Sequence, residues 1–111
     1  MALIPNGDRA LIDPLKLTGY VLDPNHRTGR HKARVFNATL GLTRDDASIL
    51  GEALLHAAET ADATLERTNV HGAHYAIEFM MTHGERSRLV RSLWTIRPDE
   101  DYPRFVSAFV L

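Results

Sequence analysis

The spacing of hydrophobic residues along the chain changes near residue 62. Before this point apolar residues recur every three or four positions, as on an amphipathic helix, and after it they alternate every second position, as on a strand. Helices followed by strands predict an α+β domain, with N-terminal helices packed on a C-terminal four-stranded antiparallel sheet. We expect one domain over residues 1–111, with a helical part at about 13–60 and the sheet at about 63–111.

Three helices are predicted in the first half of the chain. The first follows Asp13, an N-cap residue placed before a proline, and it stops at Pro24. The second covers about residues 30–40 and ends at Gly41, a residue suited to a left-handed C-cap. The third follows Thr43, which with Asp46 resembles a capping box. The stripes expected to be buried are Ala33, Phe36 and Leu40 on the second helix, and Leu50, Leu54 and Ala57 on the third.

Four strands are predicted in the second half, at about residues 63–68, 73–82, 86–97 and 104–111. Two serines in these strands stand among large apolar neighbours. Ser92 alternates with Val90 and Trp94, and Ser107 lies between Phe105 and Phe109. A buried hydroxyl needs a hydrogen-bond partner, because its loss costs on the order of 1–3 kcal/mol. If the last two strands pair, the two serines are expected to lie close together.

The composition excludes several classes of protein. The chain has 111 residues, of which 44% are hydrophobic and 24% charged, as in an ordinary soluble globule. It has no cysteine, which excludes disulfides, a thiol nucleophile and zinc–thiolate sites. No signal peptide or membrane-spanning run is apparent, so we expect a cytoplasmic protein that does not bind membranes. No two histidines stand four residues apart on a helix, and we expect neither a metal nor a cofactor.

Charge is unevenly distributed, although the formal net charge is only −1. Residues 26–34 hold four cations and no acid, residues 45–66 hold six acids and no cation, and residues 86–97 hold four arginines and no acid. The near-zero net charge therefore hides two basic blocks. Whether the two blocks meet in space is left open by the sequence.

The first basic block coincides with the predicted start of the second helix. His31 and Lys32 lie in its first turn, where free backbone N–H groups and the helix dipole favour anions. One interpretation is a phosphate-binding patch, and the other is a set of simply solvated cations. The patch would be completed by Arg27, Arg30 and Arg34.

Three stretches together resemble a known family. They are LIDPLKLTGYVLDPNHRTGRHKARVF, LGLTRDDA and LWTIRPDEDYPRFVSAFVL, and they cover nearly the whole chain. They look like a small bacterial domain family of unknown function, which occurs alone or at the ends of phage-head and polymorphic-toxin proteins. The helix-then-sheet layout is similar to the BECR superfamily, which groups barnase, EndoU, colicin-type and RelE ribonucleases.

The resemblance implies a metal-independent ribonuclease toxin that cleaves RNA phosphodiesters. The family motif Gly-x-His-Lys-Ala falls on residues 29–33, and the late-strand positions fall on Ser92, Trp94, Pro103 and Ser107. Ser92 and Ser107 stand where threonine is more frequent, and Phe109 stands where tyrosine is expected. The catalytic residues so implied are His31, Lys32 and Ser107, and the substrate-binding residues are Arg27, Arg30, Arg34, Ser92 and Trp94.

The chemistry suits these side chains, because histidine can transfer protons near neutral pH and cations stabilise the charge that builds on phosphorus. The implied partners are RNA and a cognate immunity or antitoxin protein encoded nearby. An alternative is a non-catalytic binding module, whose basic patch holds a protein partner or a nucleic acid. A third interpretation is a remnant retained only as a stable fold. The oligomeric state is left open.

Overall fold

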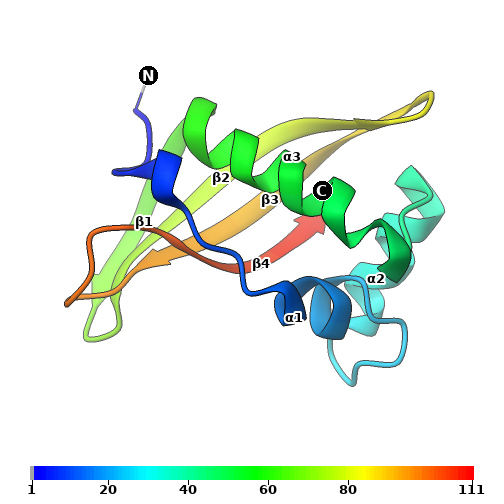
Figure 1. Ribbon diagram of the computed structural model, residues 1–111, viewed down its shortest axis with the longest axis horizontal. Helices are drawn as coiled ribbons and strands as arrows, with labels where there is room; N and C mark the ends of the chain where they lie inside the picture. The colour runs from blue at the N-terminus through cyan, green and yellow to red at the C-terminus, as the bar shows by residue number, and fades with distance from the viewer. Residues whose placement is uncertain (1) are drawn as a thin grey trace.

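A computed structural model describes residues 2–111 of the chain (Figure 1). The first half is helical, and the second half forms a four-stranded antiparallel sheet in the order β1-β2-β3-β4. This arrangement confirms the predicted α+β fold. The elements are η1 (Gly7–Arg9), α1 (Pro14–Lys16), η2 (Leu17–Val21), α2 (Arg30–Leu40), η3 (Arg44–Asp46), α3 (Ala47–Thr60), β1 (Ala63–Asn69), β2 (Gly72–His83), β3 (Arg86–Ile96) and β4 (Arg104–Val110).

The two long helices form as their sequences predict. Gly41 ends α2 in the left-handed conformation, with a φ of 70°, which glycine adopts without strain. Thr43 and Asp46 form a capping box ahead of α3, and the Asp46 carboxylate accepts the Thr43 N–H at 2.9 Å. The stripes Ala33, Phe36, Leu40 and Leu50, Leu54, Ala57 are all buried, as predicted. The apolar faces of α2 and α3 therefore pack into one core.

The first predicted helix is broken into two short elements. Asp13 caps α1 by accepting the Leu15 N–H at 3.0 Å, and the chain then widens into the π-helical turn η2. The turn is closed by a hydrogen bond from the Leu22 N–H to the Leu17 carbonyl at 2.9 Å. It buries Leu17 and Val21 against the core. Tyr20 is left only partly buried, on the side of η2 that faces α2.

The two edges of the sheet differ. The outer edge of β4 is met by the N-terminal segment, where Leu11 forms a parallel bridge with Arg104. The Leu11 N–H donates to the Pro103 carbonyl and the Phe105 N–H donates to the Leu11 carbonyl, both at 2.9 Å. Figure 1 shows this segment beside the start of β4, whereas α2 lies near its C-terminal end. β1 forms the other edge, and its side chains are mostly exposed.

A bulge at Val106 changes the register of β4. The register pairs Trp94 with Phe105, Leu93 with Ser107, and Ser92 with Ala108. Because one extra residue is inserted in β4, Ser107 is shifted away from the face that Phe105 occupies. Ser92 and Ser107 therefore lie on adjacent paired strands, one position out of register, but their side chains are on opposite faces of the sheet and their hydroxyls do not meet.

An ion pair closes the connection between β3 and β4. The Arg104 guanidinium donates to both Glu100 carboxylate oxygens at 2.7 Å, and the Tyr102 hydroxyl donates to the same carboxylate at 2.8 Å. These hydrogen bonds, with that from Arg104 the stronger, lower the pKa of Glu100 to about 2. The carboxylate stabilises the folded chain only while it is ionised.

This ion pair predicts a pH dependence of stability. Because the pKa of Glu100 is depressed in the folded chain, its contribution is complete above its ordinary pKa of 4.5 and is lost as the pH falls towards 2. We expect the free energy of unfolding to fall more steeply over this range in the wild type than in Glu100→Gln. Urea denaturation at pH 7, 4.5, 3 and 2 measures the difference. Parallel pH dependences in the two proteins would contradict the assignment.

Candidate functional site

The loop before α2 is organised by His26. Its Nδ1 accepts the backbone N–H groups of Thr28 at 3.1 Å and Gly29 at 2.9 Å, so the neutral ring carries its proton on Nε2. The Tyr20 ring meets the His26 ring edge-on, with 4.9 Å between the centroids. His26 thus folds the chain back, so that the start of α2 lies against η2.

Two residues of the Gly-x-His-Lys-Ala motif serve this close packing. A Cβ atom on Gly29 would lie 2.2 Å from the Tyr20 carbonyl oxygen, closer than real atoms approach. Ala33 is 5% exposed and lies on the buried face of α2. The motif residues Gly29 and Ala33 therefore allow the start of α2 to pack closely against η2, apart from any chemical role of the motif.

Lys32 is the motif residue that enters a polar cluster. Its Nζ donates a hydrogen bond to the Tyr20 hydroxyl at 2.6 Å and lies 4.6 Å from the centroid of the Tyr20 ring. This hydrogen bond is the main cause that lowers the pKa of Tyr20 below its ordinary value. Burial opposes the shift, while Ser107 and the charge of Lys16 act in the same direction as Lys32.

Ser107 lies beside this pair and has no hydrogen-bond partner of its own. Its side chain is 5% exposed, and among residues 2–111 its Oγ finds no group in hydrogen-bonding geometry. Ser107 is nevertheless near enough to the Tyr20 phenol to lower its pKa. A buried hydroxyl left unpaired is costly, and a ligand that accepted or donated a hydrogen bond there would relieve that cost. We call Tyr20, Lys32 and Ser107 the phenol cluster.

His31 lies next to the phenol cluster, on the solvent side. It is exposed, and it lines a shallow hollow of about 380 Å³ between α2 and the end of β4. The other residues of the hollow are Lys32, Val35, Phe109 and Val110. Lys32 thus belongs both to the hollow and to the cluster.

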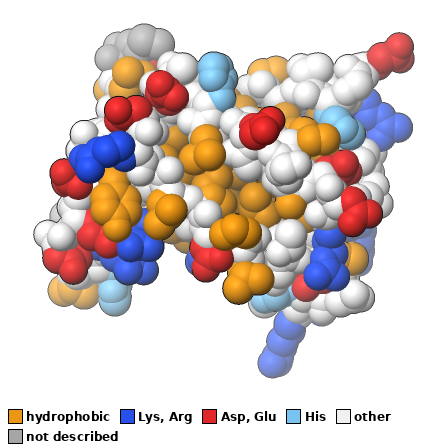
Figure 2. Space-filling model, viewed as in Figure 1, with side chains coloured by type: hydrophobic (Ala, Val, Ile, Leu, Met, Phe, Trp, Pro, Cys, Tyr) orange, Lys and Arg blue, Asp and Glu red, His pale blue; other side chains and the backbone are white. Residues whose placement is uncertain are grey.

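The three arginines of the first basic block lie outside the hollow that His31 and Lys32 line. Arg27 is exposed in the loop, while Arg30 and Arg34 line a different hollow of about 430 Å³, beside Leu42 and Asp45. Residues four apart on a helix share a side, and His31 points elsewhere than Arg30 and Arg34. On the face seen in Figure 2, cations lie towards the periphery and apolar side chains gather at the centre.

Ser92 and Trp94 occupy the core, so the prediction that they contact a substrate is wrong. They are 0% and 1% exposed. The Ser92 hydroxyl donates to the Ile77 carbonyl at 2.9 Å and accepts the Trp94 Nε1–H at 2.9 Å. The polar groups of both residues are therefore satisfied by each other and by the neighbouring strand, and neither reaches a surface.

Sequence reasoning missed Tyr20. It lies twelve residues before Lys32, and no periodic pattern relates the two positions. They meet because the loop around His26 reverses the chain. Gly29 gave no clear signal, since glycine is common just before a helix, and only the structure shows that it is required here by the close approach of the Tyr20 carbonyl.

Residues 2–111 contain neither a membrane-spanning helix nor a cluster of metal-ligating side chains. No helix in this range is long and apolar enough to cross a membrane. Nor do three His, Asp or Glu side chains gather there closely enough to hold a metal ion.

Comparisons with known proteins identify a family and a shared fold. A family model described as "Domain of unknown function (DUF6883)" matches residues 3–111. No curated protein matches the chain. One similar solved structure is described as "Contact-dependent growth inhibition toxin - immunity protein complex from Klebsiella pneumoniae 342". A chain of that complex matches with a TM-score of 0.72 and 13% identity, over 90% of this chain and 98% of its own, which establishes a common fold.

Proposed function

The chain belongs to the DUF6883 family, and from this premise we propose that it is a toxin-like domain that cleaves RNA phosphodiesters without a metal ion. The similar complex contains a growth-inhibition toxin and its immunity protein. We accordingly propose a cognate immunity protein as a partner of this chain. RNA as the substrate is proposed from the chemistry of the phenol cluster.

The observation that carries the proposal is the short hydrogen bond between Lys32 Nζ and the Tyr20 hydroxyl. An ammonium group held beside a phenol lowers the pKa of the phenol and makes it a better proton donor to an alkoxide leaving group. The same ammonium is available to a phosphate oxygen that carries developing negative charge. The unpaired Ser107 hydroxyl adds a hydrogen-bond donor beside the pair.

The proposed reaction needs one base and one acid. His31, as neutral imidazole, accepts the proton of the ribose 2′-hydroxyl, and the 2′-oxygen attacks phosphorus. The bond from phosphorus to the 5′-oxygen breaks, leaving a 2′,3′-cyclic phosphate. The Tyr20 phenol gives its proton to the departing 5′-oxygen, while Lys32 and Ser107 hold the non-bridging oxygens. Water then returns a proton to Tyr20 and accepts the one on His31.

A second candidate function is a non-catalytic binding module. It is favoured by the exposed Arg27, Arg30 and Arg34, none of which takes part in an ion pair within residues 2–111. Such cations could hold an acidic protein or a nucleic acid. In that case Gly29 and Ala33 serve only the packing of α2, and the phenol cluster has a structural role.

The two functions differ in what they do to RNA. We expect purified protein to fragment total RNA, with and without EDTA, at some pH between about 5 and 9. The products should end in 2′,3′-cyclic phosphate, which mass spectrometry detects. The binding module would instead be established by two results together. RNA would stay intact after long incubation at high protein concentration, and the wild type would bind RNA in a way that Arg30→Gln does not.

A further inference from the structure

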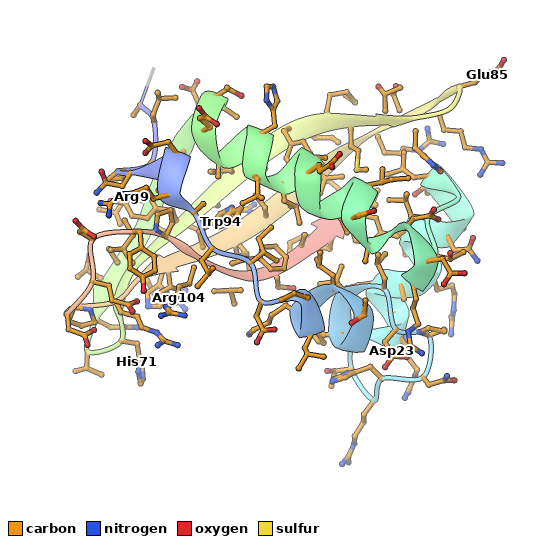
Figure 3. The ribbon with its side chains drawn as sticks, in the orientation of Figure 1. Arg9, Asp23, His71, Glu85, Trp94 and Arg104 are labelled. Carbon is orange, nitrogen blue, oxygen red and sulfur yellow. The ribbon has the colours of Figure 1, made fainter. Side chains whose placement is uncertain are left out.

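A second polar hollow lies at the opposite end of β4. It encloses about 600 Å³ where the start of β4, the turn between β1 and β2, and the segment before α1 meet. Figure 3 shows Arg104 and His71 at this end of the molecule, far from Glu85 at the tip of the β2–β3 hairpin. The lining includes Lys16, His71, His74, Thr95, Arg97 and Arg104.

The wall of this hollow is held by a hydrogen-bond network around His74. Its Nε2 lies 2.9 Å from Asn69 Oδ1, and its Nδ1 lies 2.9 Å from the Thr95 hydroxyl. Asn69 Oδ1 also accepts the His71 N–H at 2.9 Å, which fixes the orientation of the amide. The Nε2 of His74 therefore carries a proton and donates it to Asn69, while Nδ1 and the Thr95 hydroxyl form a second hydrogen bond that holds the ring in place.

The surroundings of His74 are electropositive. Burial lowers the pKa of His74, and the charges of Arg67 and His71 lower it further. Lys16 and Arg97 are exposed at the hollow and form no ion pair within the described part of the chain. An anion at this position would be attracted by all of these groups.

The acids nearby offset only part of this charge. Glu100 is neutralised by Arg104, whereas Asp13 accepts the Leu15 N–H and keeps its negative charge. Asp13 and Asp99 are the acids of the lining. Three cations form no ion pair within residues 2–111: Lys16 and Arg97 in the lining, and Arg67, whose charge acts on His74 from outside it.

The hollow and the phenol cluster lie along the same strand, β4. Lys16 lines the hollow and is also close enough to Tyr20 to act on its hydroxyl. Arg104 to Val110 spans roughly 20 Å at about 3.3 Å per residue. Ser107 lies between the two ends of this stretch. Cations thus occur near both ends of β4, with Lys16 and Arg97 at its start and Lys32 at its end.

We propose that this second hollow binds a phosphate of the single-stranded RNA whose scissile bond lies at Tyr20 and Lys32, so that the strand runs along β4. The proposal rests on the proposed function for its substrate class. It predicts that affinity grows with oligonucleotide length until the strand reaches the hollow. Inorganic phosphate, which lacks the remainder of the strand, should bind weakly.

The test uses binding, so that it does not depend on cleavage. A 2′-O-methyl hexanucleotide cannot form the cyclic product, and its affinity for the full chain is measured by fluorescence anisotropy over a series of salt concentrations. Lys16→Gln and Arg97→Gln should each reduce the slope of log affinity against log salt by about 0.7, the loss of one single-strand phosphate contact. The matched control is Arg88→Gln, an exposed cation of β3 near the hairpin tip, which should leave the slope unchanged.

Two comparisons locate the contact. The hexanucleotide should shift the His71 and His74 ring resonances in NMR spectra, whereas a dinucleotide should leave them in place. Equal slopes for Arg97→Gln, Lys16→Gln and Arg88→Gln would overturn the proposal, even if RNA is cleaved. Equal shifts with inorganic phosphate and with the hexanucleotide would also overturn it, because they would indicate a general anion site. Length-dependent binding without cleavage would retain the hollow and refute the ribonuclease.

Discussion

Replacing Gly29 with alanine should lower the free energy of unfolding by about 2 kcal/mol or more, within the range of overpacked interiors. The added Cβ would lie 2.2 Å from the Tyr20 carbonyl oxygen and 2.9 Å from its carbon. Because these are backbone atoms, neither can rotate away, and α2 must move off η2. The melting temperature should fall by roughly 10 °C for a chain of this size.

Gly19→Ala is the matched control for this substitution. A Cβ atom there has nothing within 4 Å, so alanine should be neutral or slightly stabilising. Thermal and urea denaturation of both variants measure the contrast. If Gly29→Ala proved as stable as Gly19→Ala, the close approach of α2 and η2 would be wrong.

Removing either half of the Tyr20–Lys32 pair should reduce RNA cleavage by about 10²-fold or more. Tyr20→Phe removes the proposed acid, a group whose contribution is typically 10²–10⁴-fold. Lys32→Met keeps most of the packing over the Tyr20 ring but removes the charge that stabilises the transition state. Single-turnover cleavage of a short RNA measures both effects, and Arg88→Met, remote from the cluster, should retain the wild-type rate.

The pH profile separates a chemical role from a structural one. The acid must be protonated, so the rate should fall as the pH rises through the lowered pKa of Tyr20. In Lys32→Met this alkaline limb should move to higher pH, because the main cause of the lowered pKa is gone. It should be absent in Tyr20→Phe. A fully active Tyr20→Phe would eliminate the phenol as the acid.

The fold could largely be predicted from the sequence, because its main elements rest on local signals. The period of the apolar residues changes once, and the caps at Gly41 and Thr43 lie next to the helices that they end or begin. The π-helical turn η2 was not predicted, since its wider winding has no distinct periodic pattern. The bridge between Leu11 and Arg104 was not predicted either, because it joins residues far apart in the chain.

The site was less predictable, because its contacts depend on how distant segments meet. His31 and Lys32 were found from their place in the first helical turn, yet the partner of Lys32 is on another element. Ser92 was expected to bind substrate because of the family resemblance, but its hydroxyl is satisfied inside the core by Ile77 and Trp94. The bulge at Val106 redirects Ser107, and alternation along a strand cannot predict an inserted residue.

The order of the strands also determines the entropy of loop closure. Each strand of the sheet pairs with the one before it in sequence, so most of its loops are short. The bridge between Leu11 and Arg104 instead encloses most of the chain. Closure cost grows only with the logarithm of loop length, at about 0.6 kcal/mol for each doubling. Between a hairpin loop of about four residues and this loop lie about four to five doublings, so the bridge costs roughly 3 kcal/mol more to close in an otherwise unfolded chain. This cost falls once the sheet and helices have formed, and the bridge then shields one sheet edge from intermolecular pairing.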